Sequence, residues 1–121
     1  MESTTQGYHY TATKAVKQYG IAEDPNSSHR PYMEDTNYCA DSYNGHPKQA
    51  LFALFDGHGG KDVSDYCAKN IATLFKQSLK ITTCTEAALI DVCQKLDAHA
   101  TNELKAKLFG STACIAYIAI E

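Results

Sequence analysis

The chain has 121 residues, of which 44% are hydrophobic and 21% are charged, and its formal net charge is −3. This length fits one domain or part of one, and the composition is ordinary for a soluble globular protein. The small negative charge gives no reason to expect binding to nucleic acid or to an anionic membrane. The longest apolar run, residues 113–120, is far shorter than the ~20 residues that span a bilayer.

The polar N-terminal residues 1–5 lack the basic and apolar regions of a signal peptide. The five cysteines are widely spaced and form no C-x-x-C pair, so we expect reduced thiols rather than disulfides or a zinc site. These features predict an intracellular protein, in the cytoplasm, the nucleus or both. Residues 1–10 are polar and predict a flexible segment, which leaves residues 11–121 as the folded part.

Residues 11–19 carry apolar side chains at a spacing that fits one face of a short helix. A strand could begin at Tyr19, and the turn-forming residues 23–28 then predict a loop. The sequence can be extended from residue 29 to about residue 43, and after a Gly/Pro loop the run 49–55 predicts a second strand. Two strands around such a loop predict an antiparallel hairpin.

The stretch Leu51–Gly60 contains five apolar residues followed by Asp-Gly-His-Gly-Gly. The apolar run has the length of a strand buried on both faces, although periodicity alone does not exclude a buried helix. Three glycines in four positions favour a tight turn in which the backbone comes close to another group. Asp56 and His58 are therefore predicted at the carboxyl end of a strand, on a loop that opens a helix and favours anions.

After the glycines, apolar residues recur every three or four positions and predict a helix of about four turns. A second helix is predicted after Thr83, because Thr83 and Glu86 have the spacing of a capping box, and Gly110 is expected to end it. Residues 111–120 then predict a strand that is apolar on both faces. The order of strands, two helices and a strand indicates an α+β fold.

The final strand needs sheet neighbours and a covering layer. Either its partner strands lie earlier in the chain or the domain is incomplete. If it is incomplete, the exposed final strand offers a route to a homodimer or to a strand-swapped assembly.

A second charged cluster is Arg30-Pro31-Tyr32-Met33-Glu34-Asp35. On a regular strand Arg30 and Glu34 would share one face, and Asp35 would lie on the other. A guanidinium can hold a phosphate through two hydrogen bonds, and carboxylates are ligands that Mg²⁺ and Mn²⁺ prefer. Arg30 and Glu34 can therefore address one phosphate- and metal-binding site.

Three motifs in order resemble the metal-dependent serine/threonine phosphatases of the type 2C (PPM) family. They are Arg-x-x-Met-Glu-Asp at residues 30–35, Asp-Gly-His-Gly-Gly at residues 56–60, and Phe-Gly-Ser-Thr-Ala at residues 109–113. The resemblance runs from about Tyr19 to the last residue and identifies the chain as an N-terminal portion of the catalytic domain. It implies part of an α/β/β/α sandwich with antiparallel sheets.

The resemblance also implies a centre with two ions of Mg²⁺ or Mn²⁺. Asp56 would bridge the two metals, Glu34 would bind one of them, and the carbonyl group of Gly57 would bind the other. Asp35 would act through water or at a distorted strand end. The family draws further metal-binding aspartates from Asp-Gly and Asp-Asn motifs that would follow residue 121, so we expect weak metal binding by this chain.

Arg30 would hold the substrate phosphate, and His58 would protonate the leaving alkoxide. The substrates implied are phosphoserine and phosphothreonine proteins, hydrolysed by a metal-activated water without a phosphoenzyme. One alternative is a non-catalytic, phosphatase-like fragment that acts as a binding or interaction module. Another is a different metal-dependent phosphohydrolase whose centre is completed between two chains.

Overall fold

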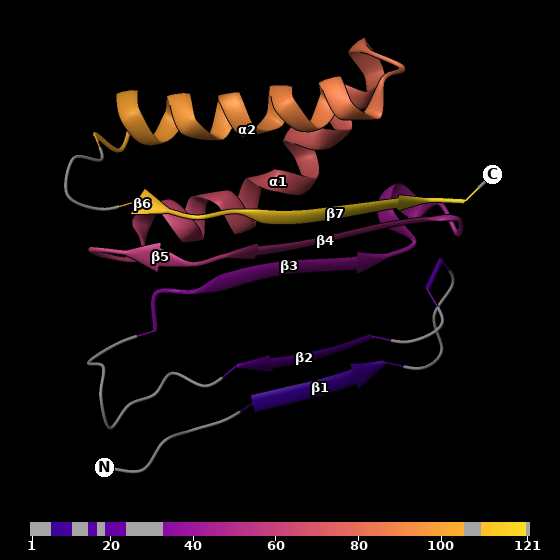
Figure 1. Cartoon of the computed structure of the whole chain (residues 1–121), viewed down its shortest axis with the longest axis horizontal. Coiled ribbons are helices and arrows are strands. Elements are labelled where there is room, and N and C mark those ends of the chain that lie inside the picture. The colour runs from indigo at the N-terminus through magenta and orange to yellow at the C-terminus, as the bar shows by residue number, and fades with distance from the viewer. Residues whose placement is uncertain (1–5, 11–14, 17–18, 24–32, 106–109, 121) are drawn as a thin grey trace. The chain divides into compact units, whose positions relative to one another are not determined.

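A computed structural model describes residues 6–10, 15–16, 19–23, 33–105 and 110–120 (Figure 1). In chain order, the elements of these residues are β1 (Gln6–Tyr10), β2 (Tyr19–Glu23), β3 (Thr36–Asp41), the 3-10 turn η1 (Tyr43–Gly45), β4 (Gln49–Phe55), β5 (Gly57–His58), α1 (Asp62–Ile81), α2 (Thr85–Asn102), β6 (Gly110–Ser111) and β7 (Cys114–Ala119). The combination of two helices with antiparallel strands confirms the predicted α+β class.

The chain divides into two compact units. The first comprises Met1–Met33, Cys39–Leu51 and Tyr117–Glu121, and the second comprises Glu34–Tyr38 and Phe52–Ala116. The second unit holds both helices and most of the predicted site residues that the structure describes.

In the first unit, β1 and β2 form an antiparallel ribbon in which Gln6 lies opposite Glu23 and Tyr10 lies opposite Tyr19. The strand expected to begin at Tyr19 is therefore confirmed. Residues 6–10 fall within the N-terminal segment for which we expected flexibility, and here they pair with β2. The helix predicted over residues 11–19 lies largely outside the described residues.

The strands β3, β4 and β7 form a three-stranded sheet in that order, and the arrows of β3 and β4 run in opposite directions (Figure 1). This arrangement confirms the predicted hairpin, and β4 spans the predicted residues 49–55. From Ala53 to the end of β4 alternate side chains differ in burial, because successive side chains of a strand point to opposite faces. Leu51, Ala53 and Phe55 are buried, whereas Leu54 is 60% exposed. Ala50 is buried as well, so the prediction of a strand buried on both faces holds at the start of β4 and is wrong at Leu54 near its end.

In the second unit, α1 and α2 pack against each other along apolar stripes. The buried residues of α1 are Val63, Ser64, Cys67, Ile71, Phe75 and Ser78, and those of α2 are Ala88, Val92, Leu96 and Ala100. Spacings of three and four residues place each set on one helix face, as the sequence predicted. The two helices are also joined by the Ser78 hydroxyl, which donates a hydrogen bond of 2.6 Å to the Asp91 carboxylate.

The ends of α2 and the final strand differ from the prediction. The helix begins at Thr85 without a side-chain cap, because Cys84 rather than Thr83 occupies the N-cap position, and the predicted capping box is therefore wrong. The Thr82 hydroxyl accepts the Cys84 amide at 3.1 Å. It ends at Asn102, well before Gly110. The predicted strand over residues 111–120 is two strands, because the Thr112 amide leaves the ladder and donates to the Asp56 carbonyl oxygen at 2.8 Å.

Candidate functional site

The strand β4 delivers Asp56 to the site, and the two-residue strand β5 follows it directly. The alternation of β4 continues through this loop, so Phe55 and Gly57 are buried while Asp56 and His58 are exposed. The carboxylate and the imidazole therefore belong to the solvent-accessible side of the chain. The main chain of Asp56 is fixed independently, because its carbonyl oxygen accepts the Thr112 amide at 2.8 Å.

Gly57 occupies a position where no larger residue fits. A Cβ atom at this position would lie 2.5 Å from the carbonyl oxygen of Glu34 and 2.9 Å from the hydroxyl oxygen of Ser64. Contacts below 3.0 Å to backbone oxygen are not relieved by a side-chain rotation. Glycine is therefore required here by the close approach of the segment that carries Glu34.

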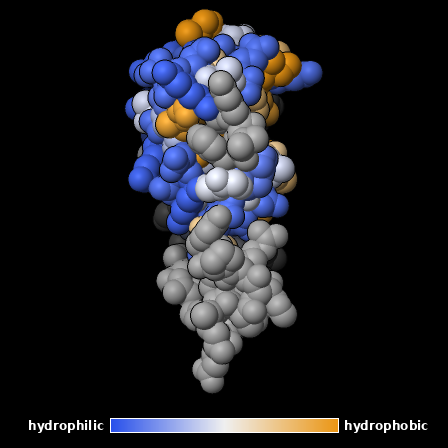
Figure 2. Space-filling model, turned by 90° about the vertical axis from the view of Figure 1, so that its left-hand side faces the viewer, coloured by the Kyte–Doolittle hydropathy of each residue, from blue (hydrophilic) through white to orange (hydrophobic). Residues whose placement is uncertain are grey.

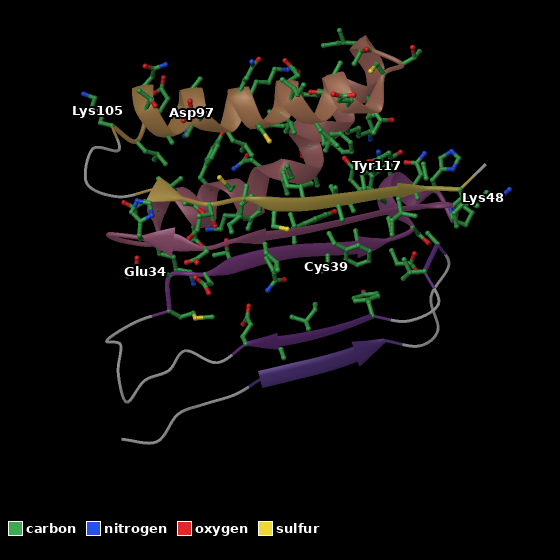
Figure 3. The ribbon with its side chains drawn as sticks, in the orientation of Figure 1. Glu34, Cys39, Lys48, Asp97, Lys105 and Tyr117 are labelled. Carbon is green, nitrogen blue, oxygen red and sulfur yellow. The ribbon has the colours of Figure 1, made fainter. Side chains whose placement is uncertain are left out.

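Glu34 is joined to the glycine loop through its side chain and its main chain. Its carboxylate oxygen Oε2 accepts the Gly60 amide at 3.0 Å, and its carbonyl oxygen accepts the Ser64 hydroxyl at 2.6 Å. Figure 3 shows Glu34 just before β3 and beside β5. A half-buried carboxylate next to the N-terminal end of α1 is also favoured by the helix dipole. The first and second sequence motifs therefore meet in this unit.

The third motif meets the second through β6. The strands β5 and β6 pair with Gly57 opposite Ser111 and His58 opposite Gly110. The His58 ring lies over Gly110, since a Cβ there would be 3.1 Å from its Cε1 atom and 3.2 Å from its Nε2 atom. All three motifs thus contribute described residues to one part of the second unit.

The His58 side chain lines a cavity of about 300 Å³ beside α1 and α2. Its polar lining includes Asp97 and Thr101 of α2 and Ser111 and Thr112 of the third motif. Figure 2 shows that the side of the protein on which β5 and β6 lie is mainly hydrophilic among the described residues. Ser111 and Thr112 belong to a sequence motif, but no sequence pattern indicated Asp97 and Thr101, whose spacing is that of ordinary surface residues of a helix.

Of the remaining predicted site residues, Asp35 is described by the structure and Arg30 is not. Asp35 is exposed and follows Glu34 immediately before β3, so neither residue lies on a regular strand. Arg30, the predicted phosphate ligand, is outside the described residues. Because Glu34 precedes β3, the expectation that it shares a face of a regular strand with Arg30 is wrong, whereas the phosphate-binding role of Arg30 stays a prediction.

Oxygen donors of the kind that Mg²⁺ and Mn²⁺ prefer are present at Glu34, Asp56 and the main chain of Gly57. Within residues 33–105 and 110–120 and the shorter described stretches, no three His, Cys, Asp or Glu side chains gather closely enough to hold a metal ion. The described residues therefore fit part of a metal-ligand set.

Two residues of the site were missed by the sequence prediction. Ser64 and Thr36 link α1 to β3, since the Thr36 hydroxyl donates to the Ser64 carbonyl oxygen at 2.7 Å. A signal for Ser64 was available, because it shares the apolar face of α1 with Val63, Cys67 and Ile71. A buried serine on such a face needs a hydrogen-bond partner, and here the partner is Glu34.

Comparison with known proteins gives a consistent result. The family model described as "Protein phosphatase 2C" matches residues 19–121. The chain is 29% identical over 108 residues to "Protein phosphatase 2C homolog 1" of Schizosaccharomyces pombe, covering 84% of this chain and 30% of that protein. The protein of the same name from Saccharomyces cerevisiae is 29% identical over 101 residues, covering 84% of this chain and 35% of its own length.

Human "Protein phosphatase 1G" is 35% identical over 75 residues, which cover 61% of this chain and 13% of that protein. The chain thus spans about a third of the length of the two yeast proteins. The family model covers all three motifs of the site, including residues 30–35 and 109–113. The chain therefore belongs to the protein phosphatase 2C family.

Proposed function

We propose that this chain forms part of a metal-dependent protein serine/threonine phosphatase and contributes Glu34, Asp56 and Gly57 to its metal centre. The observation that carries the proposal is the attachment of Glu34 to the glycine loop through the Gly60 amide and the Ser64 hydroxyl. These bonds hold a carboxylate near the loop that begins with Asp56. Membership of the protein phosphatase 2C family supports the same reading.

In this proposal Asp56, Glu34 and the Gly57 carbonyl hold Mg²⁺ or Mn²⁺, and Asp35 acts through a water molecule. When bound, the divalent ions supply an activated water and stabilise the charge that develops on the phosphoryl group. Arg30 binds the substrate phosphate. His58 gives its proton to the leaving serine or threonine oxygen, for which its exposed position on β5 leaves it accessible. Further carboxylates are needed to complete the ligand set.

The proposed substrates are phosphoserine and phosphothreonine proteins, and the proposed location is inside the cell. Neither of the described helices is both long enough and apolar enough to cross a membrane. Self-association through the final strand is a further proposal, supported by the exposed Cys114 and Ala116 of β7.

A second candidate function is a binding module without catalysis. It is favoured by the absence of a cluster of three metal-ligating side chains among the described residues. In this case the chain would bind a phosphorylated partner or a single metal ion through the same loop and would not turn over substrate.

Hydrolysis of an aryl phosphate in the presence of Mn²⁺ tests the proposal, with Asp56→Asn as the site variant. We expect Asp56→Asn to lower the metal-dependent rate by more than about 100-fold, because even changes to the partners of a metal ligand cost about 10- to 100-fold. The control is Asp65→Asn, which removes a surface carboxylate that pairs with Lys69 at 3.6 Å and contributes little to stability.

Equal rates for the wild-type chain and Asp56→Asn would overturn the catalytic proposal. A wild-type chain that binds Mn²⁺ through Asp56 but hydrolyses nothing would favour the binding module. If Mn²⁺ bound equally to both proteins, neither reading of Asp56 would stand.

A further inference from the structure

Ser64 lies in the first turn of α1 with a relative exposure of 0%, although it is polar. Its hydroxyl donates at 2.6 Å to the carbonyl oxygen of Glu34, thirty residues earlier in the chain, and lies 3.2 Å from the carbonyl oxygen of Lys61 in its own helix. A serine in a helix can satisfy its hydroxyl on the preceding turn alone. The shorter bond here instead joins the helix to the segment that carries the proposed metal ligand.

Thr36 and Gly57 also contact Ser64, so its contacts extend beyond its own helix. The Thr36 hydroxyl donates to the Ser64 carbonyl oxygen at 2.7 Å, so Ser64 is bonded on both sides to the chain that surrounds Glu34. Gly57 packs against the same atoms, since a Cβ at Gly57 would meet the Ser64 hydroxyl oxygen at 2.9 Å and its Cβ at 3.2 Å. Ser64 therefore touches both segments that supply the proposed metal ligands.

We propose that Ser64 is a positioning residue that sets the position of Glu34 relative to Gly57, an inference that rests on the proposed function. Glu34 is held at two points, its carbonyl oxygen by Ser64 and its carboxylate by the Gly60 amide. Loss of the Ser64 hydroxyl leaves the Glu34 carbonyl without this donor. The main chain of Glu34 then shifts, and the carboxylate no longer meets the Gly60 amide.

The alternative is that Ser64 only stabilises the fold, and a second serine of α1 separates the two roles. Ser78 is 1% exposed, and its hydroxyl also makes two hydrogen bonds, to the Leu74 carbonyl oxygen at 3.1 Å and to the Asp91 carboxylate at 2.6 Å. It lies at the opposite end of α1 from Glu34. Ser78→Ala therefore removes an equivalent buried hydrogen bond without touching the site.

The test compares Ser64→Ala with Ser78→Ala in the full chain. The first readout is hydrogen exchange of the Gly60 amide by NMR, measured relative to the Ile71 amide in the middle of α1 and without metal. We expect exchange at Gly60 to rise about tenfold in Ser64→Ala, as a charged hydrogen-bond partner is lost, and to stay unchanged in Ser78→Ala. The second readout is Mn²⁺ affinity, measured from the electron paramagnetic resonance signal of the free ion.

We expect Ser64→Ala to weaken Mn²⁺ binding by about 10- to 100-fold, the range found for partners of metal ligands, and Ser78→Ala to leave it unchanged. Thr36→Val and Thr36→Ser extend the test if Ser64→Ala fails to fold. Thr36→Val removes the hydroxyl that binds Ser64 while it keeps the shape, and Thr36→Ser restores it. The first should shift both readouts in the same direction by a smaller amount, and the second should return them to the wild-type values.

Unchanged exchange at Gly60 in Ser64→Ala, or an equal rise in Ser78→Ala, would overturn the positioning role. If no protein bound Mn²⁺ while the exchange pattern appeared as expected, the proposed metal centre would fail and the positioning of Glu34 would stand. If the wild-type chain bound Mn²⁺ and Ser64→Ala bound it equally well, the proposed link between Ser64 and the metal ligand would be wrong.

Discussion

The segment that carries Glu34 approaches Gly57 closely because glycine has no side chain. The carbonyl oxygen of Glu34 lies only 2.5 Å from the place where a Cβ would stand, so any other residue must push Glu34 away. The bonds that Glu34 makes to Ser64 and to Gly60 depend on this distance. One glycine thus controls both the packing of α1 and the position of the proposed metal ligand.

We therefore expect Gly57→Ala to lower the free energy of unfolding by about 1–3 kcal/mol, the usual cost of overpacking a filled site. Chemical denaturation followed by circular dichroism measures this change. The matched control is Gly110→Ala on the paired strand, whose Cβ would meet only the His58 ring at 3.1 and 3.2 Å. Because that ring can rotate away, the control should cost much less. Equal losses in the two variants would contradict the argument.

At the scale of single residues, the sequence motifs indicated residues that the structure brings into one unit, while the roles of these residues stay predictions. Asp56, His58 and Glu34 were chosen because their residue types and spacing match a known family, and the structure places them in one unit. Thr36 was missed because its role depends on a contact between distant segments, and for Ser64 the spacing indicated burial but not the partner, Glu34, about thirty residues away. The polar lining that α2 supplies to the cavity beside His58 was missed for the same reason.

Among the elements, β4 and α1 were predicted well because local signals define them. An apolar run bounded by glycines fixed the end of β4, and the apolar stripe identified α1. The helix α2 begins close to its predicted start, but the capping box predicted from the Thr83–Glu86 spacing is wrong, because Cys84 occupies the N-cap position. The break between β6 and β7 was missed because it is made by a bond from Thr112 to the distant Asp56.

The packing of α1 on α2 leads to a prediction about alkaline pH. Burial raises the pKa of Cys67 from its ordinary value of 9.0 to about 11, and the negative charge of the nearby Cys93 thiolate makes a smaller contribution in the same direction. The folded chain therefore holds this proton more tightly than the unfolded chain does. The resulting stabilisation is complete below pH 9.0 and is lost as the pH rises towards about 11.

Urea unfolding of the wild-type chain and of Cys67→Ala measures this effect. The free energy of unfolding is determined from about pH 8 to about pH 11 at roughly unit pH steps. We expect the free energy of unfolding to fall more steeply with pH in the wild-type chain than in Cys67→Ala. Cys84→Ala is the control, because Cys84 is exposed before the start of α2. Parallel pH profiles for the wild-type chain and Cys67→Ala would show that the Cys67 proton does not contribute.

For the whole molecule, the match to the family covers residues 19–121. The chain spans about a third of the length of the two yeast relatives. Leu54 is 60% exposed on β4, and the neighbouring strand β7 exposes Cys114 and Ala116. A second copy of the chain that covers these residues would remove apolar surface from water.

Sedimentation velocity at several protein concentrations tests this proposal of self-association. We expect the sedimentation coefficient of the wild-type chain to rise with concentration and that of Leu54→Lys to stay at the monomer value, since a buried lysine charge opposes the contact. Ile90→Lys is the matched control, because Ile90 is 52% exposed but lies on α2. This variant should associate like the wild-type chain. A wild-type chain that stays monomeric throughout, or an equal loss in both variants, would rule out the contact around Leu54.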